Sequence, residues 1–509
     1  MSNADGVEAI ESKRDTRRAK IKLFLVGKPR TRSLSDLAEG FDAGEHEADA
    51  KWASANDDTP LIFENIDWTD EWCIPETTLE RGDHAELGDL LLRIVEQRYR
   101  KVVAVGGRLY GYRGGIFEGV EKSELEWIVK GFAGRVYVGA PGDKSSPLRV
   151  STQTLGGSIK MACAEAADDS FFDDSVPGVA FVDGFAVVSA AGIDFRPHSP
   201  DHRARHRYEF NFTGGDSPTK WLQYLEDVFR DDADKGDKIA AVQEFMGAAI
   251  TGTATTYERA LVLLGPGANG KTRLAEIIQA SVPPGSSTSL PPALWNDQYA
   301  RPLLYGARLN VVPDLTDDAL GPVVKGIISG EGVAARSPSG PAVAFRPKAA
   351  HVFGCNQLPK TKDTSNGFFR RWLLIPMTRS FATDPARDPQ IHRKVIASDT
   401  PAIVRWALQG AVRLMRQTEY TLPSSHTLTV DRWRGKVDGV RLFVESRARR
   451  AEGTERGTAA AKLYAAFAEW ASAQGLQPET STTFGLRLSD MGVPGKNTNA
   501  GKVWGLVLL

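Results

Sequence analysis

The sequence predicts an α/β protein with a parallel central sheet, preceded by a small α+β domain. Short apolar runs alternate with helical stretches in the second half of the chain, and the first run leads into the segment GPGANGKT. Alternation of this kind is typical of three layers, in which helices cover both faces of a parallel sheet. The expected strands are residues 259–265, 308–314, 350–356 and 372–377.

The composition is that of a globular protein that does not need disulfides. The chain has 509 residues, of which 41% are hydrophobic and 25% charged, and its net charge is −1. Its cysteines, Cys73, Cys163 and Cys355, are far apart and fit no zinc spacing, which favours a reducing compartment. The sequence predicts neither a membrane span nor a secretory signal, so we expect a cytoplasmic protein without a membrane partner.

The chain divides into six segments by composition and periodicity. Residues 1–88 are polar and largely acidic, and we expect a flexible arm there. The last segment contains two helices and a hairpin-like end, a pattern that resembles a winged helix. The five segments after the arm are a small α+β domain at 89–215, a helical segment at 216–255, an α/β core at 256–385, a second helical segment at 386–432 and the winged-helix-like segment at 433–509.

The segment GPGANGKT matches the phosphate-binding pattern G-x-x-x-x-G-K-[ST]. Its glycines let the backbone curl around phosphate oxygens, and the helix that follows adds the positive end of its dipole. Lys271 would reach the β- and γ-phosphates, and the Thr272 hydroxyl would bind Mg²⁺. We therefore expect ATP with Mg²⁺ as cofactors. The expected cofactor-binding residues are Gly265, Pro266, Gly267, Ala268, Asn269, Gly270, Lys271 and Thr272.

Polar residues end the next two predicted strands. Asp314 is expected to help bind Mg²⁺ and to orient water, as an acid on a neighbouring strand does in such enzymes. Leu315 follows it in place of a second acid, and Asp317 and Asp318 lie close by, so the base that activates water stays open. Asn356 would contact the γ-phosphate or the attacking water.

Arg370 and Arg371 precede the last predicted strand. In a ring of subunits, an arginine at this position could reach the γ-phosphate of the neighbouring subunit. The alternative is a surface pair that bonds to acidic side chains of its own chain.

These motifs, in this order, resemble a superfamily 3 helicase, and most of all the poxvirus-type and phage or plasmid primase–helicases. The resemblance covers roughly residues 90–509 and is strongest at 259–377. It implies an AAA+-like hexamer that translocates on single-stranded DNA, with residues 216–255 as a collar and 386–432 as a lid. For an element of phage or plasmid type, the cytosol of a bacterial host is the expected location.

Residues 331–348 contain a Ser-Pro-Ser-Gly tip between two extended arms, a pattern that predicts a hairpin. The resemblance implies that this hairpin lines the pore and follows the DNA backbone. The candidate DNA contacts are Arg336, Arg346 and Lys348; the alternative is an exposed loop whose cations only solvate the surface.

The leading hypothesis is an ATP-dependent DNA helicase or replication initiator of a phage, prophage or mobile element. One alternative is a bifunctional primase–helicase with a diverged priming site. Another is an ATP-switched protein that binds origin duplex DNA and unwinds little. The winged-helix-like end could bind duplex DNA or a protein partner.

Overall fold

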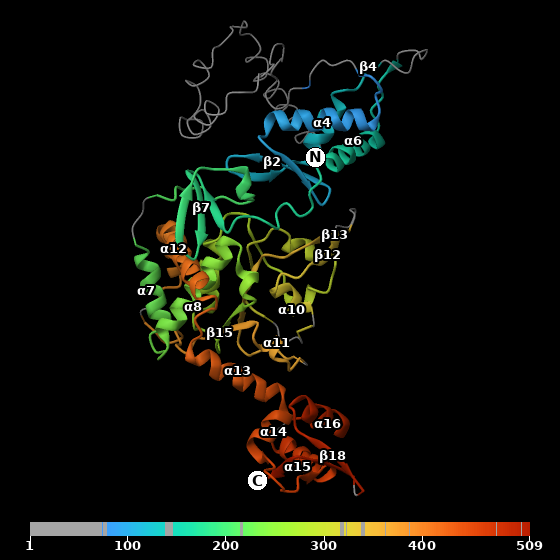
Figure 1. The fold of residues 1–509 in the computed structure, drawn as a ribbon. Coiled ribbons are helices and arrows are strands. Elements are labelled where there is room, and N and C mark those ends of the chain that lie inside the picture. Colours follow the sequence, from blue (N-terminus) through green and yellow to red (C-terminus); the bar gives the residue numbers. More distant parts are fainter. Residues whose placement is uncertain are drawn as a thin grey trace, which may run out of the picture. The chain divides into compact units, whose positions relative to one another are not determined.

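The computed structural model describes most of the chain from residue 79 onward (Figure 1). The predicted arm at 1–88 and the hairpin tip therefore lie largely outside the described residues, as do Asp317 and Asp318. The described residues are 74, 79–137, 146–213, 217–315, 320–321, 323–336, 342–361, 363–385, 387–474, 476–499 and 501–509.

The first described part is a small α+β domain with two three-stranded antiparallel sheets, of order β1-β2-β3 and β6-β7-β8, and a short β4–β5 pair. The predicted domain boundary at 89 falls inside its first helix, which begins at His84 after Asp83 accepts a capping hydrogen bond from Glu86 N. Its elements are α4 (His84–Arg98), β1 (Val102–Val105), β2 (Arg108–Arg113), β3 (Ile116–Gly119), α5 (Lys122–Lys130), β4 (Val136–Tyr137), β5 (Ser146–Pro147), α6 (Thr152–Glu165), β6 (Gly178–Phe181), β7 (Gly184–Ser189) and β8 (Gly192–Arg196).

A parallel five-stranded sheet forms the centre of the next part, in the order β10-β11-β14-β9-β15. The four predicted strands are confirmed as β9, β11, β14 and β15, and β10 is an additional short edge strand. The strands are β9 (Ala260–Leu264), β10 (Ser287–Thr288), β11 (Leu309–Val312), β14 (Ala350–Cys355) and β15 (Trp372–Pro376).

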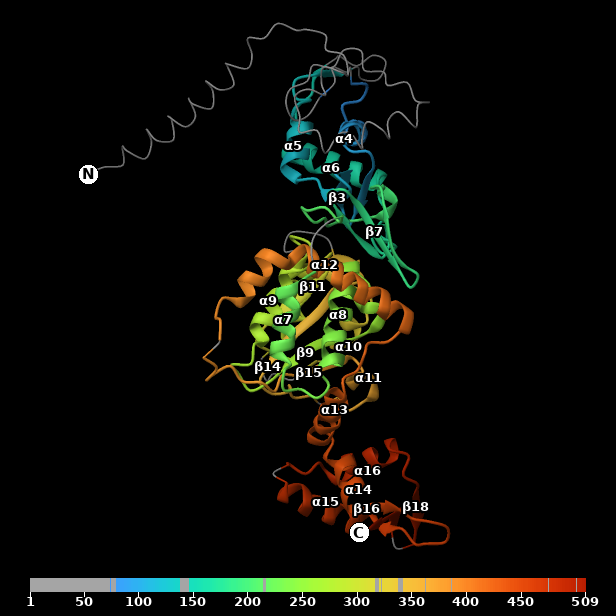
Figure 2. The same cartoon turned by 90° about the vertical axis from the view of Figure 1, so that its left-hand side faces the viewer.

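Two apolar cores cover the two faces of this sheet, because neighbouring residues of a strand point to opposite sides. In β9, Leu261 and Leu263 belong to one core, whereas Ala260 and Val262 belong to the other. Figure 2 shows α7, α8 and α9 on the first face, and α12 packs against them. The helices of the first core are α7 (Thr219–Val228), α8 (Lys235–Thr251), α9 (Lys271–Ala280) and α12 (Ile391–Gln417).

The second core contains side chains of α10, α13 and the predicted hairpin. The hairpin arms are antiparallel, with Val333 opposite Phe345. Helix α12 lies within the predicted helical segment at 386–432; Pro401 lies inside this helix and does not end it. The remaining elements of this part are α10 (Val323–Ile328), β12 (Val333–Arg336), β13 (Ala342–Phe345), α11 (Asn366–Phe369) and α13 (Ser424–Val437).

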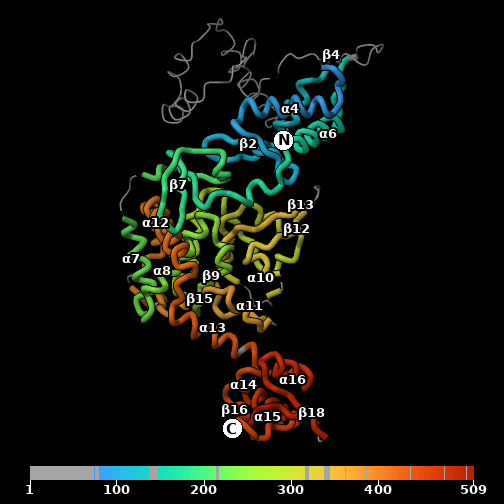
Figure 3. The backbone as a smooth tube through the Cα atoms, viewed as in Figure 1, coloured from blue at the N-terminus to red at the C-terminus, as the bar shows by residue number. Residues whose placement is uncertain are grey.

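The C-terminal part has a core of its own around Phe443, Phe467, Phe484 and Trp504. The two predicted helices are present as α15 and α16, and a β18–β19 hairpin follows them, as the tube in Figure 3 traces. The elements are α14 (Gly439–Arg447), β16 (Ala448–Arg450), β17 (Thr458–Ala459), α15 (Ala460–Ala473), α16 (Ser481–Asp490), β18 (Gly495–Thr498), β19 (Gly501–Trp504) and β20 (Leu506–Leu508). Among the described residues, no helix is both long and apolar enough to cross a membrane.

Candidate nucleotide-binding site

The glycine-rich loop joins the carboxyl end of β9 to the first residue of α9. Ala268 and Gly270 have φ values of 48° and 86°, in the left-handed region, so the backbone curls tightly before the helix begins. Gly265 has no room for a side chain, because an added Cβ would lie 1.7 Å from Asn269 Nδ2. Asn269 is buried and donates to Met377 O (3.2 Å), which ties the loop to the segment after β15.

Lys271 lies at the centre of this site, with 8% of its surface exposed. Its Nζ donates to Gly265 O (2.5 Å), Asn269 Oδ1 (3.0 Å) and Asn356 Oδ1 (3.1 Å). Burial lowers the pKa of Lys271 below its usual value, and the nearby Asp314 carboxylate opposes that shift. The structure thus brings three of the predicted residues together: Lys271, Asp314 and Asn356.

The order of the strands explains this convergence. Strand β14, which precedes Asn356, lies between β9, which leads into the loop, and β11, which precedes Asp314. All three strands are parallel, so their carboxyl ends meet at one edge of the sheet. Ligands bind at this edge in open α/β sheets.

A cavity of about 830 Å³ opens above the loop. Lys271, Thr272, Asp314 and Asn356 line it, together with the loop backbone from Gly267 onward. Thr272 is exposed, so its hydroxyl is accessible. A curled backbone, a helix N-terminus, a lysine, a hydroxyl and a carboxylate are the groups that hold a nucleoside triphosphate with Mg²⁺, so these residues fit that ligand.

Three residues that line the cavity, Tyr224, Phe381 and Arg379, belong to no motif that the sequence analysis identified. Tyr224 Oη donates to Gly270 O (3.2 Å), and Phe381 N donates to Ala268 O (2.7 Å), so both brace the loop. Arg379 is buried, forms ion pairs with Asp227 and Asp384, and stacks on the Phe381 ring. Arg379 follows the carboxyl end of β15, and the carboxyl ends of parallel strands share one sheet edge. Its position after a predicted strand could therefore have indicated that it lies near the site.

Arg370 and Arg371 lie at the opposite edge of the sheet, because they precede β15 rather than follow it. The five residues of the strand span roughly 16 Å. Neither arginine lines the cavity, and this distance excludes contact with the loop of their own subunit.

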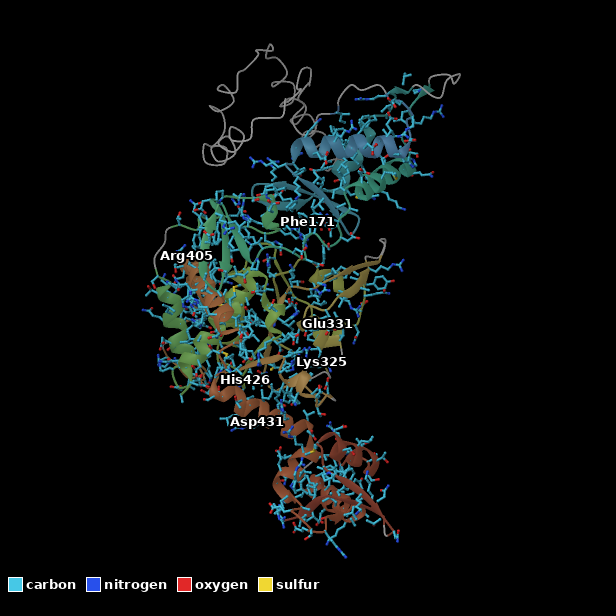
Figure 4. The ribbon with its side chains drawn as sticks, in the orientation of Figure 1. Phe171, Lys325, Glu331, Arg405, His426 and Asp431 are labelled. Atoms are coloured by element: carbon cyan, nitrogen blue, oxygen red, sulfur yellow. The ribbon has the colours of Figure 1, made fainter. Side chains whose placement is uncertain are left out.

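The two arginines differ in exposure. The Arg370 side chain is 61% exposed and bonds to Glu258 Oε2 (2.9 Å). Arg371 is buried, and its Nε donates to Lys325 O (3.1 Å) and Ser329 Oγ (3.0 Å), on or beside α10, where Figure 4 labels Lys325. Arg371 also donates to Gly367 O. Arg371 therefore stabilises its own chain, and of the two only Arg370 is presented outward; a role in trans stays a prediction.

The predicted DNA contacts separate into two kinds. Arg336 ends β12 next to the hairpin tip, whereas Arg346 follows β13 at the base, and both side chains are exposed. Lys348 instead donates to Phe172 O (2.9 Å), Asp173 O (2.7 Å) and Ser175 Oγ (2.9 Å). It therefore fastens the hairpin strand to the α+β domain, and this geometry gives no support for Lys348 as a DNA contact.

The fold and site define a mixed α/β protein with a central parallel sheet and a polar cavity at its carboxyl edge. No family model matches the chain. Over 355 residues the chain is 22% identical to the protein named "Putative helicase L207/L206" of Acanthamoeba polyphaga mimivirus. The alignment covers 63% of this chain but 36% of that protein's length.

Two solved structures overlap most of the chain at low sequence identity. The A form apo structure of the NrS-1 C-terminal region has a TM-score of 0.44 and 11% identity, over 84% of this chain and 99% of its own. An apo structure of NrS-1 residues 305–718 has a TM-score of 0.40 and 11% identity, over 84% of this chain and all of its own.

Proposed function

We propose that this chain is the motor of an ATP-dependent DNA helicase or replication initiator of a phage, prophage or mobile element. The observation that carries the proposal is the convergence of Lys271, Asp314 and Asn356 on one cavity beside the glycine-rich loop. The similarity to a mimivirus protein named as a helicase supports the same class of function.

ATP with Mg²⁺ is the proposed cofactor, and it supplies the phosphoryl group whose transfer to water releases energy. Lys271 Nζ would exchange its three oxygen partners in the chain for phosphate oxygens. Thr272 and Asp314 would hold the metal, and Asn356 would orient water or the terminal phosphate. Tyr224 and Phe381 keep the loop in the conformation that this binding requires.

Hydrolysis would need a second subunit. Because Arg370 lies across the sheet from its own loop and faces outward, it can serve the cavity of a neighbour in a ring and not its own. We propose Arg370 as the arginine that acts in trans within a hexamer, with Glu258 holding the guanidinium when no neighbour is present. Arg371 would hold the turn before β15 in place through its hydrogen bonds to Lys325 O and Ser329 Oγ.

Single-stranded DNA is the proposed partner of the β12–β13 hairpin. Arg336 and Arg346 are exposed beside it and would contact phosphates, which gives affinity without sequence preference. The C-terminal part is proposed to act as a winged helix that contacts origin duplex DNA or a protein partner.

The test is ATP turnover with and without single-stranded DNA, together with strand displacement on a forked duplex. We expect DNA to stimulate turnover and the fork to be unwound. ATP-dependent protection of one duplex site without any displacement would instead favour the origin-binding alternative.

A further inference from the structure

A second cavity lies away from the nucleotide site, and its lining contains more cations than acids. Its volume is about 50 Å³, and it lies where residues 169–175 of the α+β domain meet the end of β13. Phe171, labelled in Figure 4, marks this region. Of the five cations that line the cavity, Arg203 forms an ion pair with Asp174 (3.3 Å). We name the other four the cation cluster: Arg205, Arg308, Arg346 and Lys348.

Within the described part of the chain, Arg308 is the member of the cluster that has a buried nitrogen with no hydrogen-bond partner. Among the described residues, no acceptor bonds to its guanidinium, and its Nη1 is buried. That nitrogen packs over Gly252, where an added Cβ would lie 1.3 Å from it. Gly252 ends α8, so the helix dipole is favourable there, but no hydrogen bond forms. Burial, and then repulsion by Arg205, lower the pKa of Arg308 to about 10.

Within the part of the chain that the structure describes, Arg205 contacts aromatic rings and forms no ion pair. Its guanidinium lies 4.5 Å from the ring centre of Tyr305, 4.8 Å from that of Phe172 and 5.3 Å from that of Tyr110. Rings stabilise a cation without neutralising it, so the charge of Arg205 still acts on its neighbours. Arg346, at the exposed rim, has no ion pair within the described residues.

Two acids line the cavity, Asp169 and Asp173, against the four cations of the cluster. Asp169 accepts from Gly106 N (2.9 Å). Burial raises the pKa of Asp173, although Lys348 and Arg346 oppose that shift. Burial, followed by Arg308, lowers the pKa of Lys348 to about 8. His206 bonds to Gly306 O (2.8 Å), and burial lowers its pKa to about 4, so it is neutral near pH 7.

Buried charges in proteins are normally paired or hydrogen-bonded, because an unpaired one is costly. Here like charges converge on an open space, and Arg308 has no acceptor within the described chain. Arginine donors match the geometry of phosphate oxygens.

We propose that this cavity binds a phosphate group, with Arg308 as its principal donor and Arg346 at the entrance. The phosphate could be free inorganic phosphate or a backbone phosphate of single-stranded DNA. The proposal does not depend on ATP hydrolysis or on unwinding.

The test uses the full chain carrying Lys271→Ala, which removes a main phosphate ligand at the glycine-rich loop. The melting temperature Tm is measured in inorganic phosphate and in chloride of equal ionic strength. We expect phosphate to raise Tm, and the further change Arg308→Gln to abolish most of that gain. In chloride, Arg308→Gln should itself raise Tm by about 2–4 °C, since it removes an unpaired charge.

Two matched variants sharpen this experiment. Arg93→Gln changes an exposed arginine on α4 and should keep the whole phosphate-dependent gain. Arg308→Lys keeps the charge and should keep part of it. An equal gain in the Arg308→Gln chain, or a lower Tm in chloride with an unchanged response to phosphate, would overturn the proposal.

A second readout separates the two sources of phosphate. Affinity for an oligo-dT strand is measured against salt concentration for the same chains. If the ligand is a backbone phosphate, Arg308→Gln should lower the slope of log affinity against log salt by about 0.7. An unchanged slope together with the lost Tm gain assigns the site to free phosphate.

Discussion

The two cavities hold their cations in opposite ways. In the larger one, Lys271 has three oxygen acceptors from its own chain within 3.1 Å. In the smaller one, Arg308 has none among the described residues. A lysine with exchangeable oxygen partners can let a ligand come and go, whereas an arginine without partners depends on a ligand to be satisfied.

The difference also reflects how each site is assembled. The larger site is built from one contiguous loop and two neighbouring strand ends. The smaller one draws residues from the α+β domain, the segment before β11, and the end of β13 with the residues that follow it. A ligand at the smaller site would therefore connect two parts of the fold, while a ligand at the larger site acts on the loop that holds it.

The largest expected effect is on ATP turnover, which should depend on the larger cavity and not on the smaller one. Lys271→Ala should reduce ATP turnover to background, because it removes the buried cation beside the loop that would bind the β- and γ-phosphates. Arg308→Gln should leave turnover in the absence of DNA unchanged. Steady-state phosphate release on both variants measures this, and equal losses in the two would remove the distinction.

The conformation of the loop is the next feature to test. Gly265→Ala would place its Cβ against Asn269 and 2.7 Å from Met377 O, which should cost about 1–3 kcal/mol of unfolding free energy and weaken nucleotide binding. Gly156→Ala is the control, because it lies in the exposed middle of α6 with open space around it. It should stabilise by about 0.5–1 kcal/mol. Urea unfolding of both variants provides the values, and a harmless Gly265→Ala would contradict the described loop.

Acid should weaken the fold through buried neutral histidines. Burial lowers the pKa of His426 and of His206 to about 4 and that of His351 to about 3, all below the usual 6.5. As pH falls, these histidines take up protons in the unfolded chain at a higher pH than in the folded chain. The stability that comes from keeping them neutral is therefore complete above about pH 6.5 and is lost as pH falls toward 4. Each histidine contributes a slope of up to about 1.4 kcal/mol per pH unit.

His426 is the residue on which to check that slope. Its Nδ1 accepts the hydrogen bond of Leu374 N (3.0 Å), and protonation would remove this acceptor. His426→Asn should lose stability at pH 7.5 but show a shallower decline down to pH 5. Parallel pH profiles of Tm for the wild type and the variant would show that His426 does not titrate in this way.

The smallest expected effect concerns the hairpin. Arg336→Ala should lower the salt slope of single-stranded DNA binding by about 0.7, as the loss of one phosphate contact does. Lys348→Met should leave that slope unchanged and instead lower Tm, because it removes three bonds to residues 172–175. The reverse pattern would restore Lys348 as a DNA contact.

Much of the fold and of the candidate nucleotide site could be predicted from the sequence. The motif around Lys271 is contiguous, and parallel strands bring Asp314 and Asn356 to the same edge by geometry alone. The start of the helix at 391–417 could not be predicted, because proline usually breaks a helix. Here the helix continues through Pro401.

Contacts between side chains that are brought together only by folding could not be predicted from the sequence. Arg370 and Arg371 are adjacent and chemically identical, and only the turn before β15 decides which one is buried. Lys348 donates to Phe172 O and Ser175 Oγ, which lie more than 170 residues earlier in the chain and belong to no motif. Arg379 acquires its role from Asp227 and Asp384, which flank it only in the folded chain.

The central claim is that hydrolysis takes place between subunits, with Arg370 completing the neighbour's cavity. The most direct measurement is ATP turnover in mixtures of wild type and Arg370→Ala at constant total protein. The pure variant should bind ATP yet lose about 10³–10⁵ in turnover, and small fractions of it should depress activity more than in proportion. A strictly proportional decline, or full turnover by Arg370→Ala alone, would contradict the account.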